Sequence, residues 1–110
     1  MNNFIVIKPG ESPVVKQLDY KGIRAELDGG WTECIRFTKN ALAYVDDEGK
    51  IKGLPINELA TKLCKRYQIG LNPCDVIVGT FIITGREDMQ GQLTNVPQTL
   101  VDQIVKADAD

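Results

Sequence analysis

The chain has 110 residues, of which 13 are Lys or Arg, 15 are Asp or Glu and none is His. This near-balanced charge argues against nucleic-acid binding through a basic surface, and no apolar run approaches the roughly 18 residues of a membrane span. The lack of His removes the commonest general base and the commonest metal ligand, so we expect neither a metal nor a cofactor. The length predicts a single domain over residues 1–110.

The first third of the chain predicts a hairpin followed by a short helix. The four apolar residues Phe4–Ile7 indicate a buried strand, and Pro9-Gly10 turns the chain towards a second extended segment. Ile23 and Leu27 lie one helical turn apart. The expected elements are strands over 4–7 and 14–18 and a helix over 20–28 that Gly29-Gly30 ends.

The middle of the chain predicts further strands. Residues 31–38 alternate, with a mainly apolar face of Trp31, Glu33, Ile35 and Phe37. Another strand is expected over 42–45, and the turn residues 47–50 indicate a hairpin with 51–54 as its second strand, which Pro55 ends.

The second half predicts a helix, a central strand and a C-terminal helix. Asn57 is a good N-cap, and Leu59, Leu63 and Tyr67 recur at helical spacing. This helix is expected to end at Gly70, and a strand over 76–83, covered on both faces and ended by Gly85, is expected to follow. We then expect a polar loop over 86–92, a helix from Val96 and a frayed tail over 107–110. Together these elements predict an α+β fold, with about five to six strands in a mainly antiparallel or mixed sheet and two to three helices.

The three cysteines indicate neither a disulfide framework nor a zinc site, because their number is odd and no C-x-x-C pair occurs. Cys34 and Cys64 are expected to be small buried side chains, whereas Cys74 is expected to be exposed. Free cysteines are typical of a reducing compartment, so we expect the protein in the cytosol.

Two places suggest a binding site. Gly79 and Thr80 interrupt the apolar run with a glycine that permits close approach and a hydroxyl that needs a partner, and Asn57 begins a helix whose free N–H groups suit an anion. Arg36 or Arg66 is the expected anion partner. The structural alternatives are helix packing over Gly79, a plain N-cap at Asn57 and a solvated basic helix face over Lys62, Lys65 and Arg66. The acidic cluster Asp46-Asp47-Glu48 matches no EF-hand spacing, so a solvated turn is expected there.

Several blocks resemble a small domain of unknown function found in phages, prophages and plasmids of Firmicutes and other bacteria. The resemblance covers about residues 4–85 and depends most on Gly53-Leu54-Pro55 with Asn57 and on Asp75 through Phe81, and further on Pro9-Gly10, Gly29-Gly30-Trp31 and Asp47-Glu48-Gly49-Lys50. The chain departs from the family pattern in its longer helix after Asn57 and in the loop to Asn72. The resemblance implies an origin in mobile elements and an intracellular setting, but no activity.

No catalytic constellation is visible, so we expect a non-catalytic phage or prophage accessory protein. It would bind a small anionic, nucleotide-derived ligand and so counter host defence, an inference by analogy with other mobile-element proteins. The alternative is a protein-interaction module that inhibits or adapts a host or phage protein. A second alternative is a small enzyme whose carboxylates meet only in space. A homo-oligomer fits either binding role.

Overall fold

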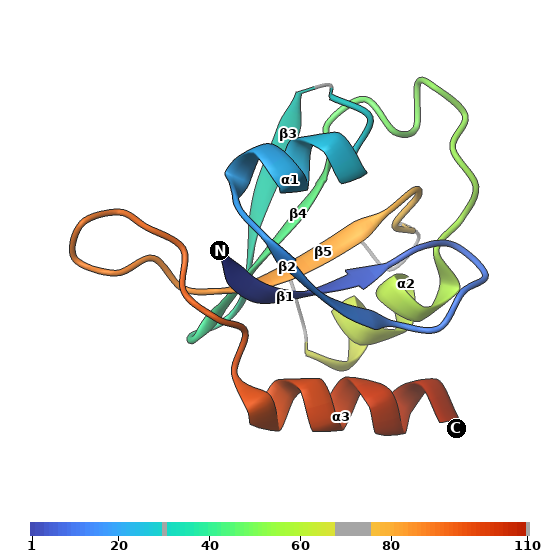
Figure 1. Ribbon diagram of the computed structural model, residues 1–110. Helices are drawn as coiled ribbons and strands as arrows, with labels where there is room; N and C mark the ends of the chain where they lie inside the picture. Colours follow the sequence, from blue (N-terminus) through green and yellow to red (C-terminus); the bar gives the residue numbers. More distant parts are fainter. Residues whose placement is uncertain (30, 68–75, 110) are drawn as a thin grey trace.

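The computed structural model describes residues 1–29, 31–67 and 76–109 (Figure 1). In this part of the chain, five antiparallel strands form one sheet in the order β2-β1-β5-β4-β3. The strands are β1 (Asn2–Ile7), β2 (Val14–Leu18), β3 (Thr32–Thr38), β4 (Ala41–Asp46) and β5 (Phe81–Gly85), and the helices are α1 (Tyr20–Glu26), α2 (Glu58–Arg66) and α3 (Gln98–Ala109). The predicted α+β fold is confirmed.

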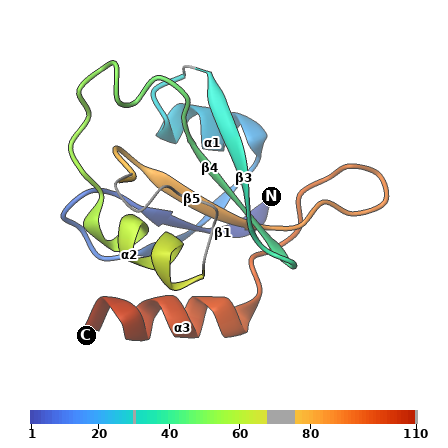
Figure 2. The ribbon, with the colours of Figure 1, turned by 180° about the vertical axis from the view of Figure 1, so that it is seen from behind.

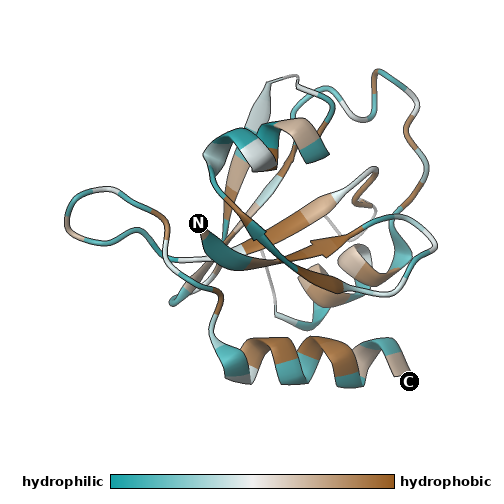
Figure 3. Ribbon diagram, viewed as in Figure 1, coloured by the Kyte–Doolittle hydropathy of each residue, from teal (hydrophilic) through white to brown (hydrophobic). Residues whose placement is uncertain are grey.

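The sheet lies between two helical layers, with α1 on one face and α2 and α3 on the other (Figures 1 and 2). In β1, Phe4 and Val6 belong to the core on the α1 face, whereas Ile5 and Ile7 belong to the core on the α2 and α3 face. The apolar residues of β5 alternate in the same way, which is why residues 4–7 of β1 and 81–83 of β5 are apolar without a break (Figure 3). The prediction of a central strand covered on both faces is therefore confirmed for β5.

Helix α1 is too short to cover its face of the sheet. It begins where Asp19 Oδ1 accepts the Gly22 N–H at 2.8 Å, and it buries Ile23, as the helical spacing predicted. Its 7 residues span about 10 Å, whereas the outer strands of a five-stranded sheet lie about 19 Å apart. Part of the α1 face is therefore left for loops to cover.

The hairpin predicted around 47–50 is wrong, because residues 47–54 form successive turns instead of a second strand. Asp46 folds the chain back: its Oδ1 accepts the Glu48 N–H at 2.8 Å, and its Oδ2 accepts a hydrogen bond from the Lys52 ammonium at 2.7 Å. Ile51 is 88% exposed. Side-chain bonds to nearby groups compete here with a strand ladder, so the apolar residues of 51–54 form no strand.

Strand β5 begins at Phe81, later than the start predicted at Val76, because Gly79 interrupts the extended chain. Gly79 has a φ of 74°, a left-handed conformation that only glycine adopts without strain. Its N–H donates to the Pro55 carbonyl at 2.8 Å, and a Cβ there would lie 2.7 Å from Leu54 Cδ1. Through this hydrogen bond, Gly79 connects the segment before α2, which includes Leu54 and Pro55, to the segment that leads into β5.

Strand β3 buries less than its alternation predicted, because an edge strand has a neighbouring strand on only one side. On its expected apolar face Phe37 is buried, but Trp31 lies outside the strand and is 78% exposed. Cys34 is exposed, which corrects the expectation of a buried thiol. Cys64 is buried on α2, as predicted.

The C-terminal helix continues to Ala109, so 107–109 do not fray as expected. The buried methyl group of Ala107 belongs to the core, and the Ala107 carbonyl accepts a hydrogen bond from Lys62 Nζ at 3.1 Å. Gly85, expected to follow β5, is instead its last residue. Expectations for Gly30, Gly70, Cys74 and Asp110 lie outside the described residues.

Candidate functional site

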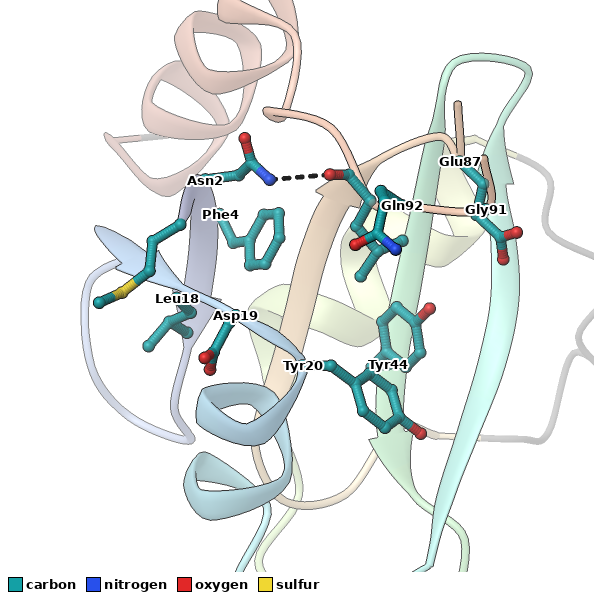
Figure 4. A pocket seen from close by; sticks show the side chains of 11 residues that line it. Asn2, Phe4, Leu18, Asp19, Tyr20, Tyr44, Glu87, Gly91 and Gln92 are labelled. Carbon is teal, nitrogen blue, oxygen red and sulfur yellow. Dashed lines mark hydrogen bonds between the residues drawn. The ribbon is translucent and has the colours of Figure 1, made fainter. Parts of the chain in front are cut away.

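A cavity of about 390 Å³ opens on the part of the sheet that α1 leaves uncovered (Figure 4). Buried Phe4 and Tyr44 face it from the sheet, and exposed Tyr20 stands at its edge at the start of α1. The loop after β5 supplies the remaining wall. We call this cavity the tyrosine pocket; its lining residues are Met1, Asn2, Phe4, Leu18, Asp19, Tyr20, Tyr44, Glu87, Gly91, Gln92 and Leu93.

The two tyrosines give the pocket an aromatic surface with a fixed orientation. The ring centroids of Tyr20 and Tyr44 lie 6.2 Å apart at an interplanar angle of 74°, an edge-to-face arrangement that aromatic rings favour. The Tyr20 hydroxyl lies 3.4 Å from Thr32 Oγ1 on β3. Burial raises the pKa of Tyr44 well above its usual value, and a hydrogen bond with Cys34 and the charge of Glu87 raise it further. Tyr44 therefore presents a neutral hydroxyl at physiological pH.

The loop wall of the pocket is held in place by hydrogen bonds. Asn2 Nδ2 donates to the Leu93 carbonyl at 2.8 Å and so ties the loop to β1 (Figure 4). Within the loop, Asp88 Oδ1 accepts the N–H groups of Gln90 and Gln92, each at 2.9 Å. At the base, the Gly85 N–H donates to the Thr94 carbonyl at 2.9 Å, and a Cβ at Gly85 would collide with Asn95. The wall is thus formed before any ligand arrives.

The structure brings three of the predicted site residues together at the start of α2 and β5. Asn57, 1% exposed, caps α2 by accepting the Ala60 N–H at 3.1 Å, and its Nδ2 donates to the carbonyls of Ile7 and Gly79 at 2.9 and 2.8 Å. The amide of Asn57 is thus fully engaged within the protein. Half-buried Thr80 follows Gly79 and lines a small cavity of about 140 Å³.

The two predicted anion partners lie elsewhere. Arg36 is exposed on edge strand β3 and Arg66 is exposed at the end of α2, and neither lines the cavities at Asn57 or at Thr80. Carboxylates line both cavities instead: Glu26, Asp28 and Asp46 near Thr80, and Glu11, Glu58 and Asp108 near Asn57, where Lys8 is the cation. Lys16 and Lys52 neutralise two of these carboxylates, but apart from Lys8 no cationic side chain of the described residues lines either cavity. An anion therefore finds little positive charge there.

The acidic cluster after β4 stabilises a turn. Asp46 is 8% exposed, so it is not the solvated residue that was expected. Burial alone would raise the pKa of Asp46, but hydrogen bonds from Lys52 and the Glu48 N–H outweigh burial and lower it. No group of three Cys, Asp or Glu side chains that could hold a metal ion occurs in the described part of the chain.

The comparison with protein families gives a clear result. A family model for a domain of unknown function, DUF3846, matches residues 1–108. The chain belongs to the DUF3846 family. No curated protein and no solved structure matches it. The expectation of a small domain of unknown function is therefore confirmed, whereas its specific motifs and its distribution in phages, prophages and plasmids stay predictions. Within residues 1–29, 31–67 and 76–109, the DUF3846 chain has no helix long and apolar enough to cross a membrane.

Sequence reasoning missed the tyrosine pocket of this DUF3846 chain. Its lining comes from the start of β1, the β2–α1 junction, the middle of β4 and the loop after β5. The one local signal is Tyr44, whose hydroxyl stands out in the apolar run of β4 and needs a partner. The other contributors are ordinary core, helix and loop residues that carry no shared signal until the fold brings them together.

Proposed function

We propose that this protein is a non-catalytic binding protein whose binding site is the tyrosine pocket. One observation carries the proposal: a preformed cavity of about 390 Å³ with an aromatic floor and a polar rim. Small-molecule sites are commonly about 300–1,000 Å³ in volume and combine apolar walls with a few oriented polar groups. Asn2 and Gln92 supply such polar groups beside Phe4 and Tyr44 (Figure 4).

The chemistry of the pocket favours binding over catalysis. Its two carboxylates, Asp19 and Glu87, are both exposed and stand on opposite sides of the view in Figure 4, with the tyrosine rings between them. A carboxyl group that acts as a general acid needs shielding from water to keep its proton. Neither residue has that shielding, and Asp19 Oδ1 is already used as the cap of α1.

We place this binding protein in the cytosol of a host cell, where it counters host defence. The proposal rests on the resemblance to a mobile-element family and on free cysteines, which suit a reducing compartment. The ligand originally expected at Asn57, Gly79, Thr80, Arg36 and Arg66 was an anion. Because carboxylates line those cavities, the proposal depends on the tyrosine pocket instead.

The experiment is native mass spectrometry of protein purified gently from host cells. We expect an added mass of a few hundred daltons that denaturation removes, and we expect Tyr20→Ala to lose it because that side chain forms the edge of the pocket. Ile51→Ala, which is also exposed but lies outside the pocket lining, is the control and should keep it. An added mass that Tyr20→Ala retains, or its absence from the wild type, would contradict the proposal. The same spectra report any homo-oligomer.

The loop after β5 favours a second candidate, a protein-interaction module. This loop projects from the body of the protein (Figures 1 and 2), and Met89 near its tip is 99% exposed. Because Asp88 braces the loop, little conformational entropy is lost when a partner contacts Met89. A host protein that co-purifies with wild type and with Tyr20→Ala, but not with Met89→Ser, would support this candidate. Co-purification that survives Met89→Ser would count against it.

A further inference from the structure

We propose that the tyrosine pocket receives an organic cation, an ammonium or guanidinium group attached to an apolar stem. This inference rests on the proposed binding function and adds the chemical class of the ligand. It follows from the charges, the rings and the apolar floor of the same cavity.

The charges of the pocket are negative. Of its lining residues within the described part of the chain, Asp19 and Glu87 carry carboxylates, and the one cationic group is the N-terminal ammonium of Met1, so negative charges outnumber positive ones. Among the described residues, neither carboxylate forms an ion pair with a Lys or Arg side chain. Other acidic residues of the protein do find partners: Glu26 pairs with Lys16 at 2.9 Å, and Asp46 pairs with Lys52 at 2.7 Å. The pocket thus keeps two carboxylates that a cation can reach.

The aromatic rings favour the same ligand. The face of a tyrosine ring carries negative partial charge and attracts a cation within about 6 Å of its centroid. Tyr20 is 53% exposed, and its ring stands roughly perpendicular to that of Tyr44 at a centroid distance of 6.2 Å. A ring pair in this arrangement offers a corner in which a compact cation contacts both. Phe4 and Leu18 beside the rings can take up its apolar stem (Figure 4).

Other ligand classes fit the pocket less well. An anion meets two carboxylates of the same sign, and Coulomb repulsion opposes its entry. A neutral ligand partly removes the carboxylates from water without supplying a charge that compensates them. A cation alone is attracted both by the carboxylates and by the ring faces.

The test is an NMR titration of isotope-labelled protein with three fragments, each of which contains a phenyl ring. Binding is monitored by the chemical shifts of the backbone amides. Benzylamine carries a positive charge, benzyl alcohol none and benzoate a negative one. We expect benzylamine to shift the amides of Tyr20, Tyr44 and Gln92 to saturation, with an affinity about tenfold above that of benzyl alcohol, and benzoate to bind most weakly. Added salt should weaken benzylamine binding alone, because charge screening acts on the ion.

A double variant checks the carboxylates. Asp19→Asn keeps an N-cap side chain, and together with Glu87→Gln it removes both charges from the pocket. We expect benzylamine affinity to fall about tenfold, to that of benzyl alcohol. The matched control is Glu11→Gln with Glu33→Gln, two exposed carboxylates outside the pocket, which should change nothing.

The outcomes separate the two proposals. If no fragment shifts the pocket amides, the proposed binding function fails. If benzoate or benzyl alcohol binds as well as benzylamine, the site stands but the inference of a cation is wrong. A last comparison distinguishes the source of the cation, since n-butylamine has the shape of a lysine side chain. A blocked lysine tripeptide that binds as tightly as n-butylamine indicates a protein side chain, whereas binding of n-butylamine alone indicates a free amine.

Discussion

Asn57 joins three segments of the chain through one buried side chain. It caps α2, holds the Ile7 carbonyl at the end of β1 and holds the Gly79 carbonyl before β5. Its own N–H donates to the Ile77 carbonyl at 2.7 Å. Sequence reasoning recognised the cap, which depends on local spacing, but the bonds to Ile7 and Gly79 depend on the tertiary fold.

We expect Asn57→Ala to lower the free energy of unfolding by about 3 kcal/mol, because it removes a helix cap and leaves two buried carbonyls without their donor. Denaturant unfolding measures the effect. Asn40→Ala, at an exposed turn, is the control and should change stability by less than about 0.5 kcal/mol. An Asn57→Ala protein as stable as wild type would show that the residue is kept for a ligand.

The two described cysteines should differ in reactivity. Cys64 is 0% exposed, and burial raises its pKa to about 11, whereas Cys34 is exposed on β3. In a Cys74→Ser background, we expect a thiol-specific chromogenic reagent at mildly alkaline pH to label Cys34 quickly and Cys64 only when the protein unfolds. Fast labelling of two thiols in the native protein would contradict the packing of α2.

At the scale of elements, the corner between α2 and β5 depends on Gly79. We expect Gly79→Ala to destabilise the protein by about 2–3 kcal/mol, because the methyl group would meet Leu54 and the left-handed conformation would be strained. Gly10→Ala has a similar φ of 76° but open space around it, so it should cost only about 1 kcal/mol. Equal thermal midpoints for the two variants would mean that Leu54 moves aside freely.

Most elements could be predicted because their signals are local. The apolar run of β1, the N-cap Asn57 and the spacing of Leu59 and Leu63 lie within one stretch of sequence each. The errors arose where side-chain contacts outside the periodic pattern decide, whether nearby or distant in sequence. The side chain of Lys52 binds Asp46 and helps to convert an expected strand into turns, and Gly79 delays β5 because the chain from Leu54 lies against it.

At the scale of the whole molecule, the tyrosine pocket could not be predicted because four separate segments line it. The strand order places β1 beside β5 and β5 beside β4, which brings Phe4 close to Tyr44. The shortness of α1 then leaves this area uncovered. Neither the order of strands nor the position of a helix on a sheet follows from local periodicity, since turns of this kind permit several sheets.

The stability of the whole protein should fall in acid. The pKa of Asp46 and that of Glu26, which accepts a hydrogen bond from Lys16, are both lowered in the folded state. Their contribution is complete above the unfolded pKa values, near pH 4–4.5, and is lost as the pH falls through the lower folded values.

We expect Asp46→Asn to be less stable than wild type at neutral pH, with the difference disappearing towards about pH 2. Thermal melts across this pH range measure it. Asp102→Asn, an exposed carboxylate on α3, should give a curve parallel to wild type. If the gap between Asp46→Asn and wild type stayed constant with pH, the pair with Lys52 would not be the cause.

The pairing of β1 with β5 affects when the protein can fold during its synthesis. Ile5 lies opposite Ile83, so the centre of the sheet joins residues that are far apart in the sequence. The ribosome therefore releases β1, with its apolar side chains, long before its central partner exists. Pairings between such distant residues form slowly and leave folding intermediates that expose apolar surface and are prone to aggregate. Nascent chains that stop short of Phe81 should need chaperones, and the native sheet should form only after β5 has been synthesised.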